Sequence, residues 1–367
     1  GRMKTRNIIT QPIPEQLRFP ASNGLTIRAD FNGGVLSTDL GPLILGGVDR
    51  QIQLTHQMAE AFNDPRHPCY IGHRLTDLMA QRVYQIACGY EDANDANALR
   101  KDPLFKMGVG RTPLEEDQDL ASAATFSRLE NAATSRDLYR LAQVFVDQFI
   151  GSYSKVPEVL VLDMDHSEDE THGQQEFSFY NHHYRSHCYL PLFLFEGLSG
   201  KFITAVLRSG KRPKGNENAM IIKRVLKRLR DAWPETRIIL RGDGHFSNPE
   251  LMQLALDDPY TDFIFGMTGN SVLAKLAAPY IDAAGKIYQL RCRHAKQAGQ
   301  TIPKRTRTYH EVEYAAQSWP EAFRVILKAE VMSLGDKPRF VVTSLDLPSP
   351  EIVYRDLYCA RGQDENY

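Results

Sequence analysis

The sequence has no long apolar run, few cysteines and almost no net charge. No stretch approaches the roughly 18 apolar residues of a membrane-spanning helix, so we expect none. The basic N-terminus is not followed by an apolar segment, so we also expect no secretory signal. The five cysteines lie far apart without a C-x-x-C pair, which indicates reduced thiols in a cytoplasm and excludes a disulfide framework or a cysteine zinc site.

What is present is typical of a soluble globular protein. Of 367 residues, 42% are hydrophobic and 24% are charged, and at roughly 100 to 200 residues per domain this length predicts two or three domains. The net charge of −1 hides uneven blocks. Residues 201–230 hold ten bases and one acid, residues 286–310 seven bases and no acid, and residues 158–170 six acids and no base. Such blocks can hold a polyanion beside a cation pocket, or they are solvated faces, and composition leaves both interpretations open.

The first 153 residues are expected to be mainly helical. Apolar residues recur at helical spacing over roughly 50–62, 74–88, 93–101 and 135–153. Several short helices leave room for a helix-turn-helix, although no turn motif identifies one. We therefore predict a helical, DNA-binding domain over residues 1–153.

The pattern changes after Pro157. Apolar runs predict strands at 159–165, 188–195, 201–207, 237–241 and 262–267, and amphipathic helices at 218–233 and 248–256. A hairpin followed by strand–helix–strand units predicts an α/β domain over 154–281, with a mixed sheet flanked by helices. Further strand-like runs at 286–293, 307–314, 323–331 and 339–343 predict a β-rich insertion over 282–347, before a last helix that starts within 348–367.

Acidic side chains follow two of the predicted strands. Asp163 and Asp165 are two residues apart and share one face of a strand, and Asp243 follows an apolar run and lies between two glycines. Two strands of one sheet that each end in Asp can aim both carboxylates at one point, where hard oxygen ligands suit Mg²⁺ or Mn²⁺. The alternative for a single Asp at a strand end is a helix cap or a turn residue.

A third acid lies in the last predicted helix. Arg361 and Glu365 are four residues apart and Tyr358 precedes Arg361 by three, so the three side chains share one face of an α-helix. Glu365 would complete a carboxylate clamp for two metal ions. The alternative is a surface ion pair between Arg361 and Glu365.

These motifs together resemble a known family. The matching segments are LDMDHSEDETHGQQE (162–176), LPLFLFEG (190–197), LKRLRDAWPETRIILRGDGHF (226–246), PRFVVTSL (338–345) and YCARGQDEN (358–366). Over about residues 45–366 the chain resembles the DDE transposases of bacterial insertion sequences. Within them it is similar to the insertion sequence 1380 family, part of the Y-R-E group with a ribonuclease-H-like core.

The resemblance implies a fold, a reaction and a set of site residues. The fold is a ribonuclease-H-like mixed sheet flanked by helices, with a β-rich insertion and an N-terminal mainly helical domain. The reaction is cleavage of transposon ends and joining of the freed 3′-OH to target DNA by phosphodiester transfer with two Mg²⁺ or Mn²⁺ ions. The catalytic, metal-binding acids are Asp165, Asp243 and Glu365, with Asp163 in reserve. The contacts to DNA phosphates are Tyr358 and Arg361.

The implied partner is double-stranded DNA, as transposon terminal inverted repeats and as target DNA, bound by a homodimer in the nucleoid-associated cytoplasm of a bacterium. Family members carry a lysine and a further segment after the glutamate, so we expect this chain to be truncated at its C-terminus. The alternative function is a catalytically inactive, truncated DNA-binding derivative that occupies transposon ends. A metal phosphohydrolase of unrelated type is a third possibility.

Basic residues outside these motifs are candidate DNA contacts. They are Lys223, Arg224, Lys227 and Arg228 on the predicted helix, and Arg291, Arg293, Lys304, Arg305 and Arg307 in the insertion, together with Trp319. The alternatives are the solvated side of an amphipathic helix and, for Trp319, a core position in place of stacking on an unpaired base. A histidine-rich segment at 181–188 is spaced too tightly for a folded zinc site.

Overall fold

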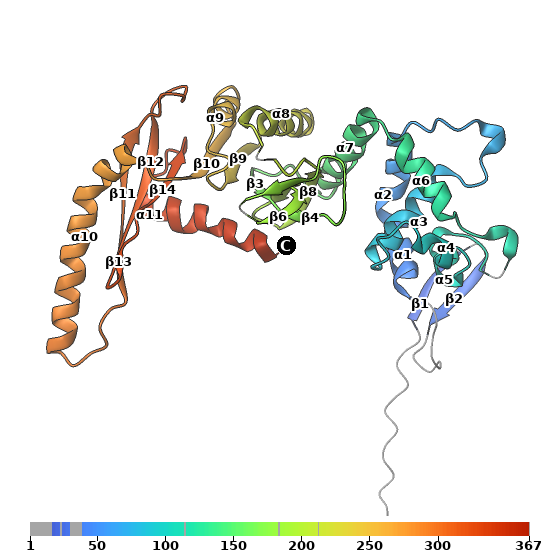
Figure 1. The fold of residues 1–367 in the computed structure, drawn as a ribbon, viewed down its shortest axis with the longest axis horizontal. Coiled ribbons are helices and arrows are strands. Elements are labelled where there is room, and N and C mark those ends of the chain that lie inside the picture. The colour runs from blue at the N-terminus through green and yellow to red at the C-terminus, as the bar shows by residue number, and fades with distance from the viewer. Residues whose placement is uncertain are drawn as a thin grey trace, which may run out of the picture. The chain divides into compact units, whose positions relative to one another are not determined.

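The chain forms two compact units, Gly1–Val144 and Phe145–Tyr367. The structure, a computed structural model, describes residues 17–22, 24–29, 39–113, 115–182, 184–211 and 213–366 (Figure 1). The boundary between the units falls inside helix α7 (Ser135–Gly151). Within the described ranges, none of the helices combines the length and the apolar character that crossing a bilayer requires.

The first unit is mainly helical in its described residues. A small antiparallel hairpin comes first, β1 (Leu17–Ser22) and β2 (Leu25–Ala29). The helices that follow are α1 (Gly41–Ile52), α2 (Leu54–Ala61), α3 (Leu75–Ala87), α4 (Asp95–Leu99), α5 (Pro103–Val109) and α6 (Ala123–Ala132), with short 3-10 turns at η1 (Pro68–Tyr70) and η2 (Glu116–Gln118). Phe105 and Phe126 are fully buried in its core.

The second unit is built on a nine-stranded mixed sheet with the strand order β11-β12-β14-β10-β9-β3-β7-β8, and β13 pairs with β12. The strands are β3 (Val159–His166), β7 (Leu192–Glu196), β8 (Lys201–Val206), β9 (Arg237–Gly242), β10 (Thr261–Met267), β11 (Arg305–Tyr314), β12 (Phe323–Met332), β13 (Gly335–Asp336) and β14 (Arg339–Thr343). β3, β7 and β8 pair antiparallel, whereas β9 and β10 run parallel to β3. The predicted mixed sheet with flanking helices is confirmed.

The strand predicted at 188–195 is split in two. Pro191 has no N–H to donate and interrupts the ladder. β6 (Ser186–Tyr189) therefore joins a separate three-stranded sheet with β4 (Asp169–Glu170) and β5 (Phe179–Asn181), while β7 joins the main sheet.

The strand predicted at 286–293 is wrong. These residues lie in the long helix α10 (Ser271–Gln297), which lies beside β11 and β12 (Figure 1). Leu273, Ala277 and Ala284 are its buried positions, and this spacing of three and four belongs to a helix. The β-rich region beyond α10 continues the main sheet, because β14 pairs with β10 and with β12.

Helices cover both faces of the sheet. The end of α7, α8 (Gly215–Ala232), α9 (Pro249–Leu256) and the start of α10 pack on one face, against Leu160, Leu162 and Met164 of β3. The segment α11 (Pro350–Ile352), η3 (Val353–Tyr358) and η4 (Cys359–Asn366) follows β14, and Val353 and Tyr354 pack on the other face, against Val161.

The alternation of a strand decides which side chains meet that last segment. Successive side chains point to opposite faces, so Asp163 and Asp165 lie on the same face as Val161, and Arg241 lies with Ile239. We call this side, which bears Asp163, Asp165 and Arg241, the acid face. The last helical segment covers the acid face.

Candidate active site

Asp165 and Asp243 lie side by side at the ends of two adjacent parallel strands. The register of β3 and β9 places Met164 beside Gly242, so the next residue of each strand is an aspartate facing its neighbour. Paired residues of adjacent strands are about 4.8 Å apart at the backbone. The structure thus brings together the two strand-end acids that the sequence singles out.

The carboxylate of Asp165 faces the last helical segment. Its Oδ1 accepts a hydrogen bond from the backbone N–H of His166 at 3.0 Å and lies 3.6 Å from Nη1 of Arg361. The side chains of Asp165 and Arg361 are 39% and 21% exposed. Since a half-exposed pair at this separation is weak, Arg361 can leave Asp165 for a stronger anion.

Asp243 is held by the turn that follows it. Its Oδ1 accepts from the backbone N–H of His245 at 2.9 Å, and its Oδ2 lies 2.8 Å from Nδ1 of the same histidine. Burial alone would raise the pKa of Asp243, but the hydrogen bonds from His245 and the nearby Arg361 outweigh it and lower that pKa below its ordinary value. Asp243 is therefore a carboxylate at neutral pH.

Tyr358 lies against β10. A methyl group added to Gly266 would collide with the Tyr358 hydroxyl, so glycine at this position allows the close approach. Burial raises the pKa of Tyr358, so its hydroxyl stays protonated at neutral pH and can donate a hydrogen bond. Tyr358 and Arg361, the two residues that the family resemblance implies as DNA contacts, both reach the acid face.

Asp163, the reserve candidate, has a structural partner. Its two oxygens accept from Nε and Nη2 of Arg241, and the two side chains are 2% and 1% exposed. Nη1 of Arg241 donates to the carbonyl oxygen of Leu357 at 2.6 Å, which ties the last helical segment to the sheet. A Cβ on Gly197 would collide with both partners. The carboxylate of Asp163 is therefore committed to Arg241 and is not open to a metal ion.

Sequence reasoning did not identify Arg241. A usable signal exists, because Arg241 is the one base in the apolar run that precedes Asp243, and it falls on the strand face that Asp243 continues. A base at a buried strand position requires a buried acid as its partner.

The last helix is irregular, and the predicted α-helical geometry is wrong. η3 is a π-helix and η4 is a 3-10 helix. A 3-10 helix repeats every three residues, so the α-helical spacing on which the sequence prediction for this segment depends does not hold in η4. The backbone of Glu365 belongs to η4, but its side chain lies outside the described residues.

His166 lies on the opposite face from Asp165 and anchors this strand end. Its ring stacks on Phe246 at 4.5 Å, and its Nδ1 is hydrogen-bonded to the Arg208 guanidinium. Burial, and then the charge of Arg208, lowers the pKa of His166 to about 3, so the imidazole is neutral. Its Nε2 is buried without a hydrogen-bond partner in the described part of the chain.

The donor set at the two strand ends fits a hard divalent cation. Asp165 and Asp243 offer partly exposed carboxylate oxygens, the ligand type that Mg²⁺ and Mn²⁺ prefer. The guanidinium of Arg361 lies 3.6 Å from Asp165, and the ring of His245 lies 2.8 Å from Asp243. Among the described residues, no group of three or more His, Cys, Asp or Glu side chains lies together.

A polar pocket of about 380 Å³ adjoins Asp243 on the acid face. It lies between the turn after β9, the loop after β10 and the start of β14. Asp243, Gly244, Gly266, Thr268, Arg339 and Tyr358 are among its lining residues. The pocket therefore begins at the candidate site and extends away from β3 across the sheet.

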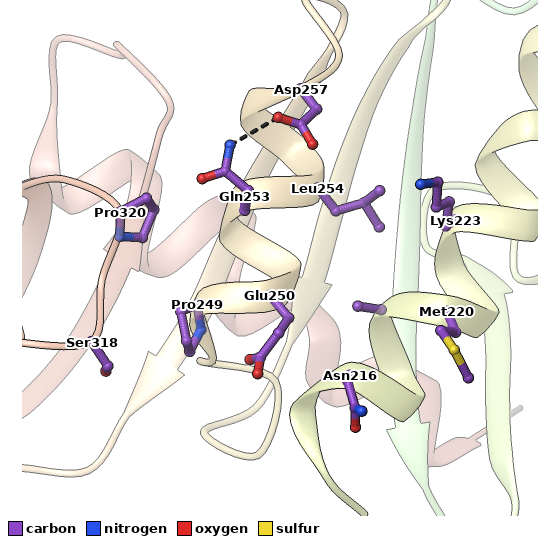
Figure 2. A pocket seen from close by; sticks show the side chains of 11 residues that line it. Asn216, Met220, Lys223, Pro249, Glu250, Gln253, Leu254, Asp257, Ser318 and Pro320 are labelled. Carbon is purple, nitrogen blue, oxygen red and sulfur yellow. Dashed lines mark hydrogen bonds between the residues drawn. The ribbon is translucent and has the colours of Figure 1, made fainter.

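A second hollow, of about 520 Å³, lies between α8 and α9, on the face opposite the acids (Figure 2). Figure 2 shows Gln253 bonded to Asp257 at its rim, with Lys223 and Glu250 on its walls. Charges of both signs line it, and neither Asp165 nor Asp243 is among its lining residues, so it is no candidate for the reaction.

The candidate DNA contacts fall in several places. Lys223, Arg224, Lys227 and Arg228 are exposed on α8, and Arg291 and Arg293 are exposed on α10. Both helices pack on the face opposite the acids, so the structure does not bring these six residues to the candidate site. Their contact with DNA stays a prediction.

The candidates near β11 have partners of their own. Lys304 is exposed, whereas Arg305 and Arg307 each lie 3.2 Å from the carboxylate of the buried Glu330. Trp319 is half-buried, with its ring 5.2 Å from that of Tyr314, and packs on the main core. These contacts favour the core interpretation of Trp319 over base stacking.

Comparisons with known proteins identify a family for the chain. The family model described as "Transposase DDE domain group 1" matches residues 19–367. The chain is similar to a piggyBac transposase in a synaptic complex with hairpin DNA, solved by cryo-EM, at 12% identity over 90% of this chain and 67% of that chain, with a TM-score of 0.43. No curated protein matches. Because the family match covers nearly all of its residues, the chain belongs to group 1 of the transposase DDE domains.

Proposed function

We propose that the chain is a DNA transposase of the insertion sequence 1380 type, which cleaves transposon ends and joins the freed 3′-OH to target DNA. The supporting observation is the pair of carboxylates, Asp165 and Asp243, at adjacent strand ends and facing Arg361. Two carboxylates with the Arg361 guanidinium beside them suit an anionic phosphodiester better than a neutral substrate.

Each side chain has a role that its contacts support. Asp165 and Asp243, with Glu365 as the third ligand, would hold two Mg²⁺ or Mn²⁺ ions. Such ions, when bound, activate the attacking water or 3′-OH and stabilise the leaving oxygen. Arg361 would exchange Asp165 for a non-bridging oxygen of the scissile phosphate, bidentately if the geometry allows. The protonated hydroxyl of Tyr358 would donate a hydrogen bond to the same strand.

The arrangement of strands supports a ribonuclease-H-like core. The order β8-β7-β3-β9-β10 has three antiparallel strands followed by two parallel ones. We take β11 to β14, predicted as an insertion, as an extension of this sheet that helps to hold the transposon end. The helical first unit would bind the inverted repeat, and a homodimer would bring two ends together.

The test is strand-specific nicking of duplexes that carry the inverted repeats flanking the gene. With Mg²⁺ or Mn²⁺ the wild-type chain should nick at the repeat boundary, and chelation with EDTA should abolish the nick. Asp165→Asn and Asp243→Asn should each lower the rate by at least about a thousandfold, since each removes a charge that would hold the ions. Asp231→Asn, at an exposed acid of α8, is the matched control and should nick like wild type.

Two results would change the conclusion. A chain that shifts the repeat in gel electrophoresis but does not nick it, with or without either substitution, is a DNA-binding derivative. Nicking that persists at the wild-type rate in both Asp→Asn variants would place the reaction elsewhere in the molecule.

A further inference from the structure

The pocket beside Asp243 carries one arginine that the site does not use. Arg339 opens β14 and lines this pocket, together with Thr268 and Gly244. Its side chain is exposed, and its guanidinium makes no ion pair or hydrogen bond with any other side chain that the structure describes. The arginines nearer the acids differ, because Arg241 is paired with Asp163 and Arg361 with Asp165.

The sheet register fixes where Arg339 stands. β10 and β14 pair Met267 with Phe340, so Thr268 and Arg339 are the next opposed residues. β9 and β10 pair Gly242 with Phe265, so Asp243 falls beside Gly266. Arg339 therefore lies two strands from Asp243, about 10 Å across the sheet, and two residues further along the strand direction.

Arg339 also points to the correct side. Phe340 and Val342 pack on the face of α8 and α9, and Val341 packs on the acid face. By strand alternation Arg339 shares the acid face with Val341, Asp165 and Arg241. Gly244, another lining residue, has no side chain that would fill the pocket. The volume of about 380 Å³ leaves room for an anion of the size of a phosphate beside the guanidinium.

We infer that this pocket binds a backbone phosphate of the DNA strand held at Asp165 and Asp243, one that flanks the scissile phosphate, with Arg339 as its counter-charge. The pocket adjoins Asp243, and the Arg339 guanidinium on its wall has no ion-pair partner among the described side chains, so it repels cations and attracts an anion. A DNA strand that crosses the sheet from β3 toward β14 passes the scissile position first and this pocket next. The inference rests on the proposed function, because that function supplies the DNA strand.

The experiment neutralises one phosphate at a time. Inverted-repeat duplexes carry a single methylphosphonate at each of the positions within a few nucleotides of the nick, and both affinity and nicking rate are measured. In the wild type, neutralising one flanking position should lower affinity and rate by about tenfold, the size of one charge-assisted hydrogen bond. Arg339→Gln should show the same loss of affinity and nicking rate on unmodified DNA, and no further loss when that position carries the methylphosphonate. The slope of its DNA affinity against salt concentration should decrease by about one phosphate contact.

Lys337→Gln is the matched control, since Lys337 is exposed, carries the same charge and lies two residues away outside the pocket lining. It should keep the wild-type response to every methylphosphonate, and Arg339→Lys should keep part of it. The inference is overturned if Arg339→Gln binds unmodified DNA with wild-type affinity. It is also overturned if this variant responds as the wild type does to a methylphosphonate at every position. If the wild type binds but never nicks, the proposed reaction fails while the affinity data still decide on the phosphate site.

Discussion

Three arginines on the acid face stand in three different electrostatic situations. Arg241 is buried and fully paired with Asp163, Arg361 makes a half-exposed pair with Asp165, and Arg339 has no acidic partner among the described side chains. The buried arginine holds structure, because its desolvated charge has no alternative partner. The other two can exchange water or a weak partner for DNA, and only they are suited to recognition.

The buried pair makes a prediction about stability. Asp163→Asn should lower the free energy of unfolding by about 3 to 5 kcal/mol, because it leaves the buried charge of Arg241 uncompensated. Asp165→Asn should cost less than about 1 kcal/mol, because that pair is partly exposed. Urea denaturation followed by circular dichroism measures both. Equal losses for the two variants would mean that Asp163 is not the structural acid.

At the scale of single residues, the sequence predicts where the acidic side chains lie better than it predicts which residues pair with them. The apolar runs before Asp165 and Asp243 suffice to place both at the ends of buried strands. The spacing of Asp163 and Asp165 does not tell that Asp163 is the structural acid and Asp165 the candidate metal ligand, since both share one strand face. The distinction comes from Arg241, which is far away in sequence and meets Asp163 only through the pairing of β3 with β9.

Among the elements, the β11–β12 pair is held by a charge cluster at one end. Burial alone would raise the pKa of Glu330, yet the hydrogen bonds and charges of Lys328, Arg305 and Arg307 lower it to about 2. A carboxyl whose pKa is lowered on folding stabilises the protein above its unfolded pKa, about 4.3, and the contribution is lost as the pH falls toward 2.

Glu330→Gln tests this cluster. At pH 7 the variant should be less stable than wild type by on the order of 2 kcal/mol, since it loses the interactions that lower the pKa of Glu330 to about 2 and its arginine partners are partly solvated. Urea midpoints of the two proteins should converge as the pH is lowered from 5 to 2. A difference that stays constant over this range would show that Glu330 acts through packing and not through its charge.

Alanine substitutions in helix α10 and just after it should change the free energy of unfolding in opposite directions. A Cβ on Gly285 meets no atom within 4 Å, so Gly285→Ala should raise the free energy of unfolding by about 0.5 to 1 kcal/mol, the helix-interior preference for alanine. Gly299 has φ of 65° just after the helix, so Gly299→Ala should lower it by about 1 kcal/mol. Chemical denaturation of the pair checks both, and a destabilised Gly285→Ala would argue against a helix there.

Two of the misread elements have physical explanations at this scale. Residues 286–293 mix Ile287, Tyr288 and Leu290 with polar residues over a short stretch, which suits a strand locally, and only the longer pattern from Leu273 to Ala295 shows a helical stripe. The irregular last helix could not be read from spacing at all. Its π and 3-10 turns depend on contacts such as that of Arg241 with the Leu357 carbonyl, which exist only in the folded sheet.

At the scale of the whole molecule, the two units have separate cores, and their stabilities should be separable. Phe126 is fully buried in the first unit and Leu240 in the second. Calorimetry of the full chain should resolve two unfolding transitions. Phe126→Ala should lower only one of them and Leu240→Ala only the other, each by the roughly 2 to 5 kcal/mol of a large core truncation. One transition that responds to both variants would show that the units unfold together.

The candidate site is assembled from segments made at very different times during translation. A nascent chain that has produced β3 and β9 already carries Asp165 and Asp243, but it has neither β14 nor the turn of helix that brings Arg361 to them. A ribosome-bound intermediate at that stage therefore carries both strand-end acids but lacks Arg361, which lies against Asp165 in the folded chain. If the chain cuts DNA as proposed, its site is complete only after synthesis has passed residue 361.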